Sequence, residues 1–286
     1  MLDIIVVTYG SARNASDCLE SMLKAAMDEP TVSWIFVDNT PTSTDADFLV
    51  AKLTAQQNVQ IIRRPDNPGF AAGCNEGVRN GRSSWIAFMN PDLEMNAETV
   101  RELANIVGTL PDGAAAVALR QRTRGFVHEG IHFNRFGWFV DRPAHSRDEI
   151  YGPSGGAGLV ARDVFESLGG FREDLFAWGE DAEFALRMVE RGHKTIGSDL
   201  RIEHRGGHSF EGDEGLTLTK NKLLLRNRFD IAARHYSLTL RAKFMLFATV
   251  VTIAKLPRYL ASGWAGQMSK VYFSGVRNLV RRHGVK

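Results

Sequence analysis

The sequence predicts an α/β fold, with a mostly parallel central sheet flanked by helices and a C-terminal helical extension. Two observations lead to this prediction. Short apolar runs alternate with segments of helical spacing through the first 110 residues, which is typical of βαβ units and a parallel sheet. From residue 226 onward, apolar stretches alternate with Lys and Arg in a helical pattern. We therefore expect a large domain over 1–225 and a basic, amphipathic helical tail over 226–286.

Four apolar runs are predicted to be the parallel strands, and four segments of helical spacing are predicted to follow them in turn. The strands are expected at 3–9, 33–39, 59–64 and 84–90, and the helices at 14–26, 45–57, 69–81 and 96–110. Asn96 suits the N-cap of the last helix, and Gly81 suits the end of the third. Because ligands bind outside the carboxyl ends of the strands in such sheets, the polar residues after these strands are expected to face one crevice.

After residue 110 of the domain, the sequence predicts secondary structure less clearly. Residues 152–171 are rich in glycine and lead into a strand and a helix, 178–194 has helical spacing, and the run that ends at His204 has the character of a strand. Residues 111–152 instead mix aromatic residues, His and Arg with weak periodicity. Since that segment is long for a connection, we expect a binding loop or lid there.

Charge is unevenly distributed along the chain. The formal net charge is +2, yet 226–286 contains twelve Lys and Arg residues and a single acid, Asp230. This asymmetry predicts that the tail meets an anionic surface. Its longest uncharged apolar stretch, 244–254, is shorter than the roughly 20 residues of a membrane span, so we expect the tail to lie on a bilayer without crossing it. The alternative is a helical pair that packs on the domain or forms a dimer.

Three features could carry chemistry, and each has an ordinary structural explanation. Asn90 and Asp92 follow the fourth strand in an Asn-Pro-Asp turn, where a carboxylate can bind Mg²⁺ or Mn²⁺ or the turn can simply end the strand. Glu180 and Asp181 begin a helix, where acids complement the helix dipole or one of them can act as a general base. His204 ends a strand and could complete a metal site with Asp92, although a lone His is usually structural.

Missing motifs exclude several classes of protein. The sequence has no GxxxxGK[ST] loop and no GxGxxG after the first strand, which argues against an ATPase and a dinucleotide dehydrogenase. It has no CxxC pair, which argues against a zinc site of that kind. Cys18 and Cys74 favour a reducing compartment over a disulfide framework. The first ten residues resemble a strand more than a signal peptide.

Several motifs in order resemble the family-2 inverting glycosyltransferases with the Rossmann-like GT-A fold, especially the rhamnosyltransferase-like branch of bacterial cell-surface polysaccharide synthesis. The motifs span about 1–225 and are IIVVTYGS, WIFVDNT, RRPDNPGFAAGCNEGVRNG, AFMNPDLEM, PSGGAGLVARDVFESLGGFREDLFAWGEDAEFALRMVERG and IEHRGGHS. The resemblance implies a donor-binding half over about 1–115 and an acceptor half over about 116–225. The implied donor-binding residues are Thr8, Tyr9, Asp38, Asn67, Gly69, Phe70, Asn75, Asn90, Gly155, Gly156 and Ala157.

The resemblance also implies roles for the acidic residues and the ligands. Asp181 matches the catalytic base with Glu180 as a supporting acid, and Asp92 and His204 match the residues that hold Mg²⁺ or Mn²⁺. The implied donor is dTDP-L-rhamnose, with UDP-galactofuranose, UDP-galactose and UDP-glucose as alternatives. The implied acceptor is a glycan or a lipid-linked glycan, handled by a cytoplasmic enzyme that is peripheral on the inner face of the plasma membrane. A homodimer is possible, and no nucleic acid is expected.

Two other functions share part of this pattern. A nucleotidyltransferase would share the nucleotide-binding sheet, but its N-terminal GxGxR loop is missing. A catalytically silent nucleotide-binding or glycan-binding scaffold on the membrane is the other alternative. The complete set of Asn-Pro-Asp, Gly-Glu-Asp and His motifs argues against it.

Overall fold

The computed structural model describes residues 1–53, 57–205 and 214–281, which divide into two compact units. The first unit comprises Met1–His132, Asp141–Phe176 and Glu180–Glu211. The second comprises Phe133–Val140, Ala177–Gly179 and Gly212–Lys286. The second unit therefore includes two short segments from the middle of the chain in addition to the C-terminal helices.

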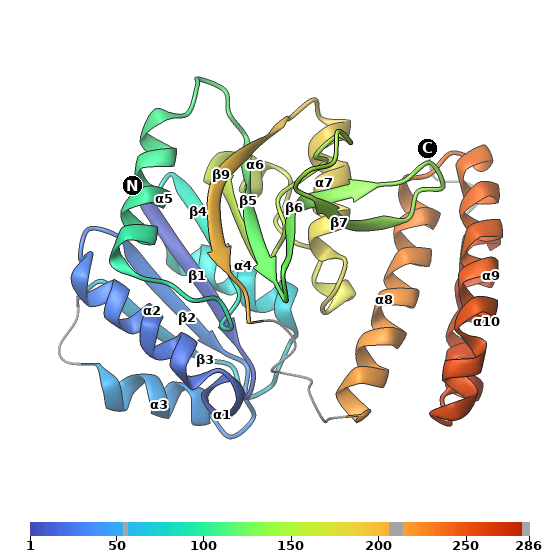
Figure 1. Ribbon diagram of the computed structural model, residues 1–286, viewed down its shortest axis with the longest axis horizontal. Coiled ribbons are helices and arrows are strands. Elements are labelled where there is room, and N and C mark those ends of the chain that lie inside the picture. The colour runs from blue at the N-terminus through green and yellow to red at the C-terminus, as the bar shows by residue number, and fades with distance from the viewer. Residues whose placement is uncertain (54–56, 206–213, 282–286) are drawn as a thin grey trace. The chain divides into compact units, whose positions relative to one another are not determined.

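A nine-stranded sheet runs through the first unit (Figure 1). Its order is β3-β2-β1-β4-β8-β5-β6-β7, and β9 pairs with β5. The strands are β1 (Leu2–Thr8), β2 (Ser33–Asp38), β3 (Val59–Arg63), β4 (Trp85–Met89), β5 (Ala116–Thr123), β6 (Phe126–Phe133), β7 (Phe139–Pro143), β8 (Ala157–Ala161) and β9 (Thr195–Glu203). The first four pair in parallel, whereas β8 is antiparallel to β4 and β5. The predicted α/β fold is confirmed, with a sheet that becomes mixed beyond β4.

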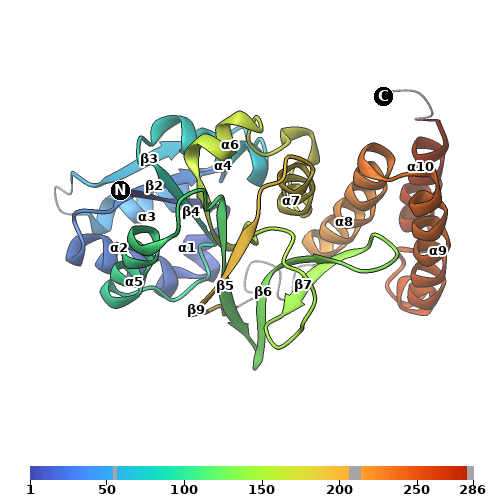
Figure 2. The same cartoon turned by 90° about the horizontal axis from the view of Figure 1, so that it is seen from above.

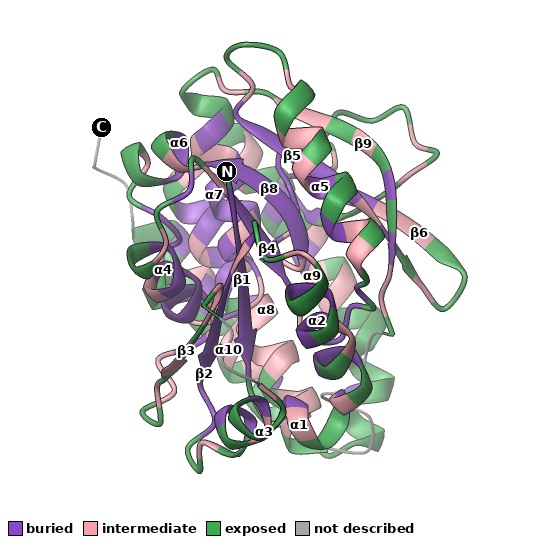
Figure 3. Cartoon of the chain, turned by 90° about the vertical axis from the view of Figure 1, so that its left-hand side faces the viewer, coloured by how far each residue is buried: buried purple, intermediate pink, exposed green. Residues whose placement is uncertain are grey.

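Helices cover both faces of the sheet (Figures 1 and 2). The helices are α1 (Ser11–Asn14), α2 (Ser16–Asp28), α3 (Thr44–Lys52), α4 (Phe70–Asn80), α5 (Ala97–Thr109), α6 (Arg162–Ser167) and α7 (Glu180–Glu190), with a 3₁₀ turn η1 (Glu173–Leu175). Helices α2, α3 and α5 contribute to one core, and α4, α6 and α7 to the other. Because successive strand residues point to opposite faces, Ile4 and Val6 enter the first core and Ile5 and Val7 the second. Strands β1, β2, β4 and β8 are accordingly almost entirely buried, whereas the outer sides of α2 and α5 are exposed (Figure 3).

The segment 111–152 contains strands β5, β6 and β7, which the sequence did not predict as strands. One reason is that these strands bury charged side chains. Glu129 and Arg142 are both buried, and Arg142 Nη1 donates a hydrogen bond to Glu129 Oε2 over 3.0 Å. A buried ion pair satisfies both charges but breaks the apolar alternation that identifies a strand. The segment expected to be a binding loop or lid is therefore ordered sheet over half of its length.

The second unit is built on three helices, α8 (Glu214–His235), α9 (Leu238–Ala261) and α10 (Ala265–Arg281). Helix α10 packs against α8 and α9, and its Gly275 leaves no room for a side chain because a Cβ there would lie 2.4 Å from the Phe229 ring. Phe229 also meets Phe244 edge to face, with ring centroids 5.3 Å apart. The predicted C-terminal helical extension is confirmed.

Asn227 of α8 ties the helices to the short segment 177–179 of the same unit. Its side chain is fully buried, and its Nδ2 donates to the carbonyl oxygens of Ala177 and Trp178, each over 2.9 Å. Gly179 follows, and after it come Glu180 and Asp181, which together form the acidic motif. The backbone that enters the acidic motif is therefore fixed by a buried amide.

Among the described helices, α9 is long and apolar enough to cross a membrane, and little of it is buried. Length and composition alone support this, and a core helix of a soluble protein can meet the same criteria. Four of its exposed apolar side chains, Leu246, Val250, Ile253 and Leu260, recur at intervals of four, three and seven residues. They therefore form one stripe along the helix.

Candidate functional site

The carboxyl ends of β1 and β2 meet side by side, as the sequence predicts. Thr8 is the register partner of Asp38, and both are fully buried, whereas Tyr9 is exposed. The hydroxyl of Thr8 has no hydrogen-bond partner among the residues that the structure describes. Such a buried group is unusual in a native protein, because it lacks the hydrogen bond that would offset its lost hydration.

Asp38 shapes the loop that follows β2. Its two carboxylate oxygens accept hydrogen bonds from the backbone N–H groups of Thr40 and Ala46, over 2.7 and 2.8 Å. Asp45 does the same for the loop after β1, accepting from Ser11 and Ala12 over 2.8 and 2.9 Å. Charge-assisted bonds of this kind compensate for the burial of a carboxylate. Asp38 thus stabilises the loop after β2, and its contact with a nucleotide remains a prediction.

The backbone of residues 67–70, where α4 begins, has an unusual conformation. Gly69 has φ +97°, and a Cβ at that position would lie 2.6 Å from the carbonyl oxygen of Phe176. Its own carbonyl accepts from Asn39 Nδ2 over 3.0 Å, and Ala71 N donates to Phe176 O over 3.1 Å. Only glycine allows the two backbones to approach so closely. This places the predicted donor loop against the residues that precede the acidic motif.

Asn75 joins α4 to the segment just before η1. Its Oδ1 accepts from Phe171 N over 2.9 Å, and its Nδ2 donates to Phe171 O and Glu173 Oε1 over 2.8 and 3.0 Å. The buried amide is therefore engaged on both of its ends within the protein. Its predicted role in donor binding is not tested by these contacts, but they show how α4 is held in place.

Asp181, the second residue of α7, lies against Gly155. Its Oδ2 accepts from Gly155 N over 3.0 Å, and its Oδ1 accepts from Ala182 N over 2.7 Å. A Cβ on Gly155 would lie 3.4 Å from both Asp181 Cβ and Phe70 Cε1, and 3.5 Å from Glu180 Oε1. Phe70, Gly155, Glu180 and Asp181 are thus brought together from three parts of the sequence.

The environment of Asp181 makes it a weaker acid than usual. Burial of its carboxyl group raises the pKa from 3.8 to about 6, and the charge of Asp141 on β7 adds to the rise. Hydrogen bonds from Gly155 and Ala182 act in the opposite direction without cancelling it. A carboxylate with a pKa near 6 can accept a proton at neutral pH more readily than an ordinary aspartate. Phe176 and Trp178, just before it, have positive φ values of 67° and 62°, a strained backbone that is common at functional sites.

Gly156, the next residue, lies against Asn90. Asn90 N donates to Gly156 O over 2.8 Å, and a Cβ on Gly156 would be 2.8 Å from Asn90 Nδ2 and 3.4 Å from Gln121 Oε1. Ala157 follows as the first residue of β8 and is fully buried. Two consecutive glycines therefore connect the acidic motif, on one side, with the Asn-Pro-Asp turn on the other.

Asp92 and His204 form the second polar group of the site. His204 Nε2 and Asp92 Oδ1 are 3.0 Å apart, and both side chains are mostly buried. One carboxylate and one imidazole suit Mn²⁺, and Mg²⁺ also binds through few protein ligands when substrate phosphates complete its shell. In the part of the chain that is described, no cluster of three or more His, Cys, Asp and Glu residues is able to hold a metal ion. Gly206, Gly207 and His208, which follow in the sequence motif, lie outside the described residues.

Sequence reasoning missed two residues of this neighbourhood, Gln121 and Asp141. Both come from the strands in 111–152, and nothing in their local sequence marks them. Their positions depend on pairing between distant strands, which local patterns do not report.

Residues 3–169 match a known family. A model of the family described as Glycosyl transferase family 2 matches residues 3–169. A low-salt glycan biosynthesis hexosyltransferase from Haloferax volcanii is 25% identical over 207 residues, which cover 68% of this chain and 64% of that protein. An N-acetylglucosaminyl-diphospho-decaprenol L-rhamnosyltransferase from Mycobacterium tuberculosis is 25% identical over 246 residues, covering 74% and 78%. The chain thus spans less than two thirds of the length of the first relative.

Solved structures agree on the fold. A mannosyltransferase from Pyrobaculum calidifontis, in complex with GDP-Man and Mn²⁺, superposes with a TM-score of 0.57 at 16% identity, covering 99% of this chain and 88% of that one. S. aureus TarS, in complex with UDP-GlcNAc, superposes with a TM-score of 0.64 at 13% identity, covering 99% and 81%. At such identities the likeness shows a common fold.

Proposed function

The chain belongs to glycosyl transferase family 2 and has the GT-A fold, and on that premise we propose that it transfers a sugar from a nucleoside-diphosphate sugar to a hydroxyl of a glycan or lipid-linked glycan. The supporting observation is the pair of glycines at 155 and 156. Asp181 lies against Gly155, and Asn90 lies against Gly156. Asn90 is two residues before Asp92 in the sequence. A proton acceptor and a polar turn suited to a diphosphate thus lie on either side of one short segment.

In the proposed reaction, Asp181 accepts the proton of the acceptor hydroxyl. The hydroxyl oxygen attacks the anomeric carbon of the donor sugar, the bond to the diphosphate breaks on the opposite face, and the configuration inverts. A divalent cation held by Asp92 and His204 would offset the negative charge that grows on the departing nucleoside diphosphate. Glu180, which is buried beside Asp181, would act as a supporting acid at the acceptor site.

The donor proposal rests on the relatives. The mycobacterial relative carries the name of an L-rhamnosyltransferase, which favours dTDP-L-rhamnose, and the TarS structure contains UDP-GlcNAc, which keeps UDP-sugars as the second choice. A Mn²⁺ ion accompanies GDP-Man in the mannosyltransferase structure, which supports a metal-dependent reaction with Mg²⁺ or Mn²⁺. The acceptor proposal, a lipid-linked glycan, follows from the same mycobacterial name.

The basic tail suits such an acceptor. Helices α9 and α10 combine exposed apolar side chains with a large excess of Lys and Arg, which favours an anionic membrane surface. We propose a peripheral enzyme on the inner face of the plasma membrane, with the stripe of Leu246, Val250, Ile253 and Leu260 in contact with lipid. A homodimer through the same stripe is the alternative.

A thermal-shift panel of nucleotide sugars, with and without Mn²⁺, tests the proposed function. Stabilisation by one donor that depends on the metal is expected, because a ligand that binds only the folded state raises its stability. Transfer assays with that donor then separate an enzyme from a silent scaffold. Formation of a sugar nucleotide from a sugar phosphate and a nucleoside triphosphate would instead indicate a nucleotidyltransferase and contradict the proposal.

A further inference from the structure

An apolar groove lies between α9 and α10 of the second unit, two helices that run side by side (Figures 1 and 2). Its volume is about 360 Å³, and its lining residues are Ala242, Met245, Leu246, Thr249, Tyr272, Phe273 and Val276. Sites for small molecules are typically about 300–1,000 Å³. Along α9 the lining extends from 242 to 249, which is roughly 10 Å of helix. The groove therefore suits a slender ligand or one part of a larger one.

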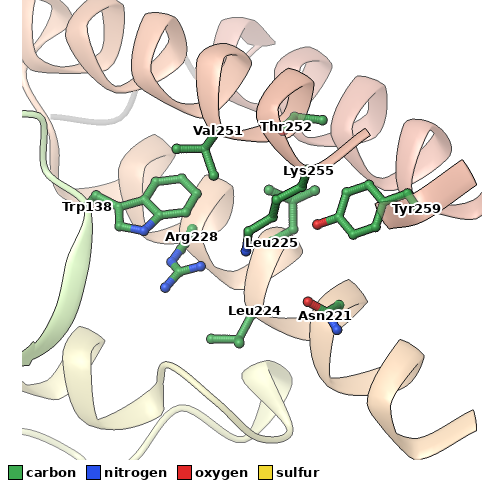
Figure 4. A pocket seen from close by; sticks show the side chains of 9 residues that line it. All are labelled: Trp138, Asn221, Leu224, Leu225, Arg228, Val251, Thr252, Lys255 and Tyr259. Carbon is green, nitrogen blue, oxygen red and sulfur yellow. The ribbon is translucent and has the colours of Figure 1, made fainter. Parts of the chain in front are cut away.

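The groove is on a different side of α9 from the one that packs on α8. On the inner side, Thr252, Lys255 and Tyr259 line a cavity of about 30 Å³ that they share with residues of α8 (Figure 4). The groove, by contrast, opens outward, since Leu246 is 65% exposed and Phe273 is 63% exposed. The helices thus pack through their inner sides and present an apolar surface on the outer side.

The polar groups in the groove are already paired with one another. Thr249 Oγ1 lies 2.6 Å from the hydroxyl of Tyr272, and it donates to the carbonyl oxygen of Met245 over 2.8 Å. Because a threonine hydroxyl has one proton, Tyr272 is the donor in the pair of hydroxyls. Both hydroxyls are thus hydrogen-bonded without a ligand, and the other lining side chains are apolar. Such a surface favours an apolar ligand.

Cationic side chains border the groove. Lys243 precedes Leu246 by three residues on α9, and Arg277 follows Phe273 by four residues on α10. Residues at these spacings are neighbours on a helix surface, and both cations are exposed. Lys and Arg lay their aliphatic stems along an apolar surface while their charged ends meet water or phosphate. The border therefore suits an anionic headgroup beside a hydrocarbon chain.

Charge also favours a lipid over a second copy of the protein. The sequences of α9 and α10 contain seven Lys and Arg residues and no Asp or Glu. In a symmetric dimer the same surface of both copies meets, so two such surfaces would bring like charges together. An anionic lipid brings the opposite charge. The groove and its border are thus complementary to a lipid.

We propose that the groove binds one acyl chain of an anionic phospholipid, with the phosphate at the border formed by Lys243 and Arg277. The proposal rests on the contact of the tail with a membrane under the proposed function, and it gives that contact a discrete site for a single chain. The lining includes Leu246 of the apolar stripe, so the site is continuous with the surface proposed to meet lipid. None of its residues is among those proposed for the donor sugar, the metal or the base.

The test is calorimetry of the full chain with lysophosphatidic acid, an anionic lipid with one acyl chain, below the concentration at which it forms micelles. We expect saturable binding of one lipid per protein. The affinity should increase about fourfold for each CH₂ that the groove buries, and it should become constant once the groove is full. Lysophosphatidylcholine of the same chain length should bind several-fold more weakly, because its choline offsets the charge of the phosphate.

Ala242→Phe tests the groove itself, because the new ring would fill part of it. This variant should bind the longest chain about tenfold more weakly or worse. Ala254→Phe is the matched control, because it adds the same ring at an exposed position of α9 outside the groove, and it should keep the affinity of the wild type. Both alanines are exposed, so both variants are expected to fold, and their melting temperatures check this.

Equal affinity in the wild type and Ala242→Phe, or an affinity that does not depend on chain length, would overturn the proposal. Stronger binding in both variants would indicate adsorption to apolar surface and would overturn it too, and equal affinity for the two lipids would contradict the anionic headgroup. A dimer that Ala242→Phe dissociates, measured by light scattering without lipid binding, would assign the groove to a second copy. Since no donor and no metal are present, failure of this test and failure of the proposed sugar transfer are separate results.

Discussion

Asp92 and His204 are 112 positions apart in the sequence, and Asp92 Oδ1 lies 3.0 Å from His204 Nε2. The backbone brings them together: Leu93 and His204 form a β-bridge, and Arg205 N donates to Asp92 O over 3.1 Å. The turn after β4 is thereby fastened to the end of β9. A cation at this point would bind to two rigid strand ends, and little reorganisation would accompany its binding.

The first prediction concerns this pair. Asp92→Asn should remove the stabilisation that Mn²⁺ confers in the presence of a nucleoside diphosphate, and turnover should fall by about two orders of magnitude, because the proposed cation loses its carboxylate. Thermal shift with and without the metal measures the first effect. Glu94→Gln, which changes an exposed neighbouring acid, should leave both unchanged. Retention of the metal-dependent shift in Asp92→Asn would exclude Asp92 as a ligand.

The second prediction separates activity from stability at Asp181. Asp181→Asn should lower turnover by about 10²- to 10⁴-fold, the usual contribution of a general base. Its melting temperature at pH 7.5 should be equal to or above that of the wild type. The raised pKa means that the folded protein disfavours the ionised carboxyl, so stability is lost as the pH rises from about 4 through 6, and the neutral amide avoids that loss. Glu190→Gln, at the exposed end of α7, serves as the control. Wild-type turnover in Asp181→Asn would eliminate it as the base.

The third prediction is the pH dependence of the reaction. Since the base must be ionised, kcat/KM should fall below a pH of about 6 with a slope of one. Asp141→Asn should move this midpoint to lower pH, because the charge of Asp141 contributes to the raised pKa of Asp181. Asp148→Asn, another exposed acid in the same region, should not move it. An unchanged midpoint in Asp141→Asn would show that the charge of Asp141 does not contribute to the pKa of Asp181.

The fourth prediction concerns Gly69. Gly69→Ala should lower the free energy of unfolding by about 1–3 kcal/mol, because the new Cβ would meet Phe176 in a backbone conformation that other residues rarely adopt. Chemical denaturation measures this loss. Gly10→Ala is the matched control: its φ is also positive, +65°, but a Cβ there has no neighbour within 4 Å. Equal losses in the two variants would mean that backbone conformation, and not the contact with Phe176, limits position 69.

The fifth prediction tests the apolar stripe of α9. Leu246→Glu should weaken binding to anionic vesicles about tenfold or more, since burying one leucine side chain in an apolar medium contributes about 1.5–3 kcal/mol. Vesicle co-sedimentation measures the effect. Val50→Glu changes an equally apolar, exposed position of α3 and should have no effect. If Leu246→Glu instead changes the oligomeric state without affecting vesicle binding, the stripe is a contact between two copies of the chain.

Much of this architecture could be predicted from local pattern. The four parallel strands have continuous apolar runs because both faces of the sheet are covered, and their ends place Thr8, Asp38 and Asn90 at one edge. The start of α7 followed from ordinary helical spacing and put Glu180 and Asp181 at its first turn.

What could not be predicted depends on contacts between distant segments. Gln121 reaches Gly156 only through the pairing of β5 with β8, and Asp141 affects Asp181 across the fold. The strands that carry them lack clear alternation because they bury charged groups such as Arg142. A single sequence gives the periodicity of each segment but not its register with a distant partner.

The hydrogen bonds of Asn227 have a consequence for protein engineering. The short segment 177–179 is held by α8 and continues directly into the acidic motif, so the C-terminal helices are not a detachable module. A truncation before residue 214 would leave the carbonyl groups of Ala177 and Trp178 without their donors immediately upstream of Glu180. Chimeras between relatives should therefore exchange 133–140, 177–179 and 214–281 together, as one interdependent set.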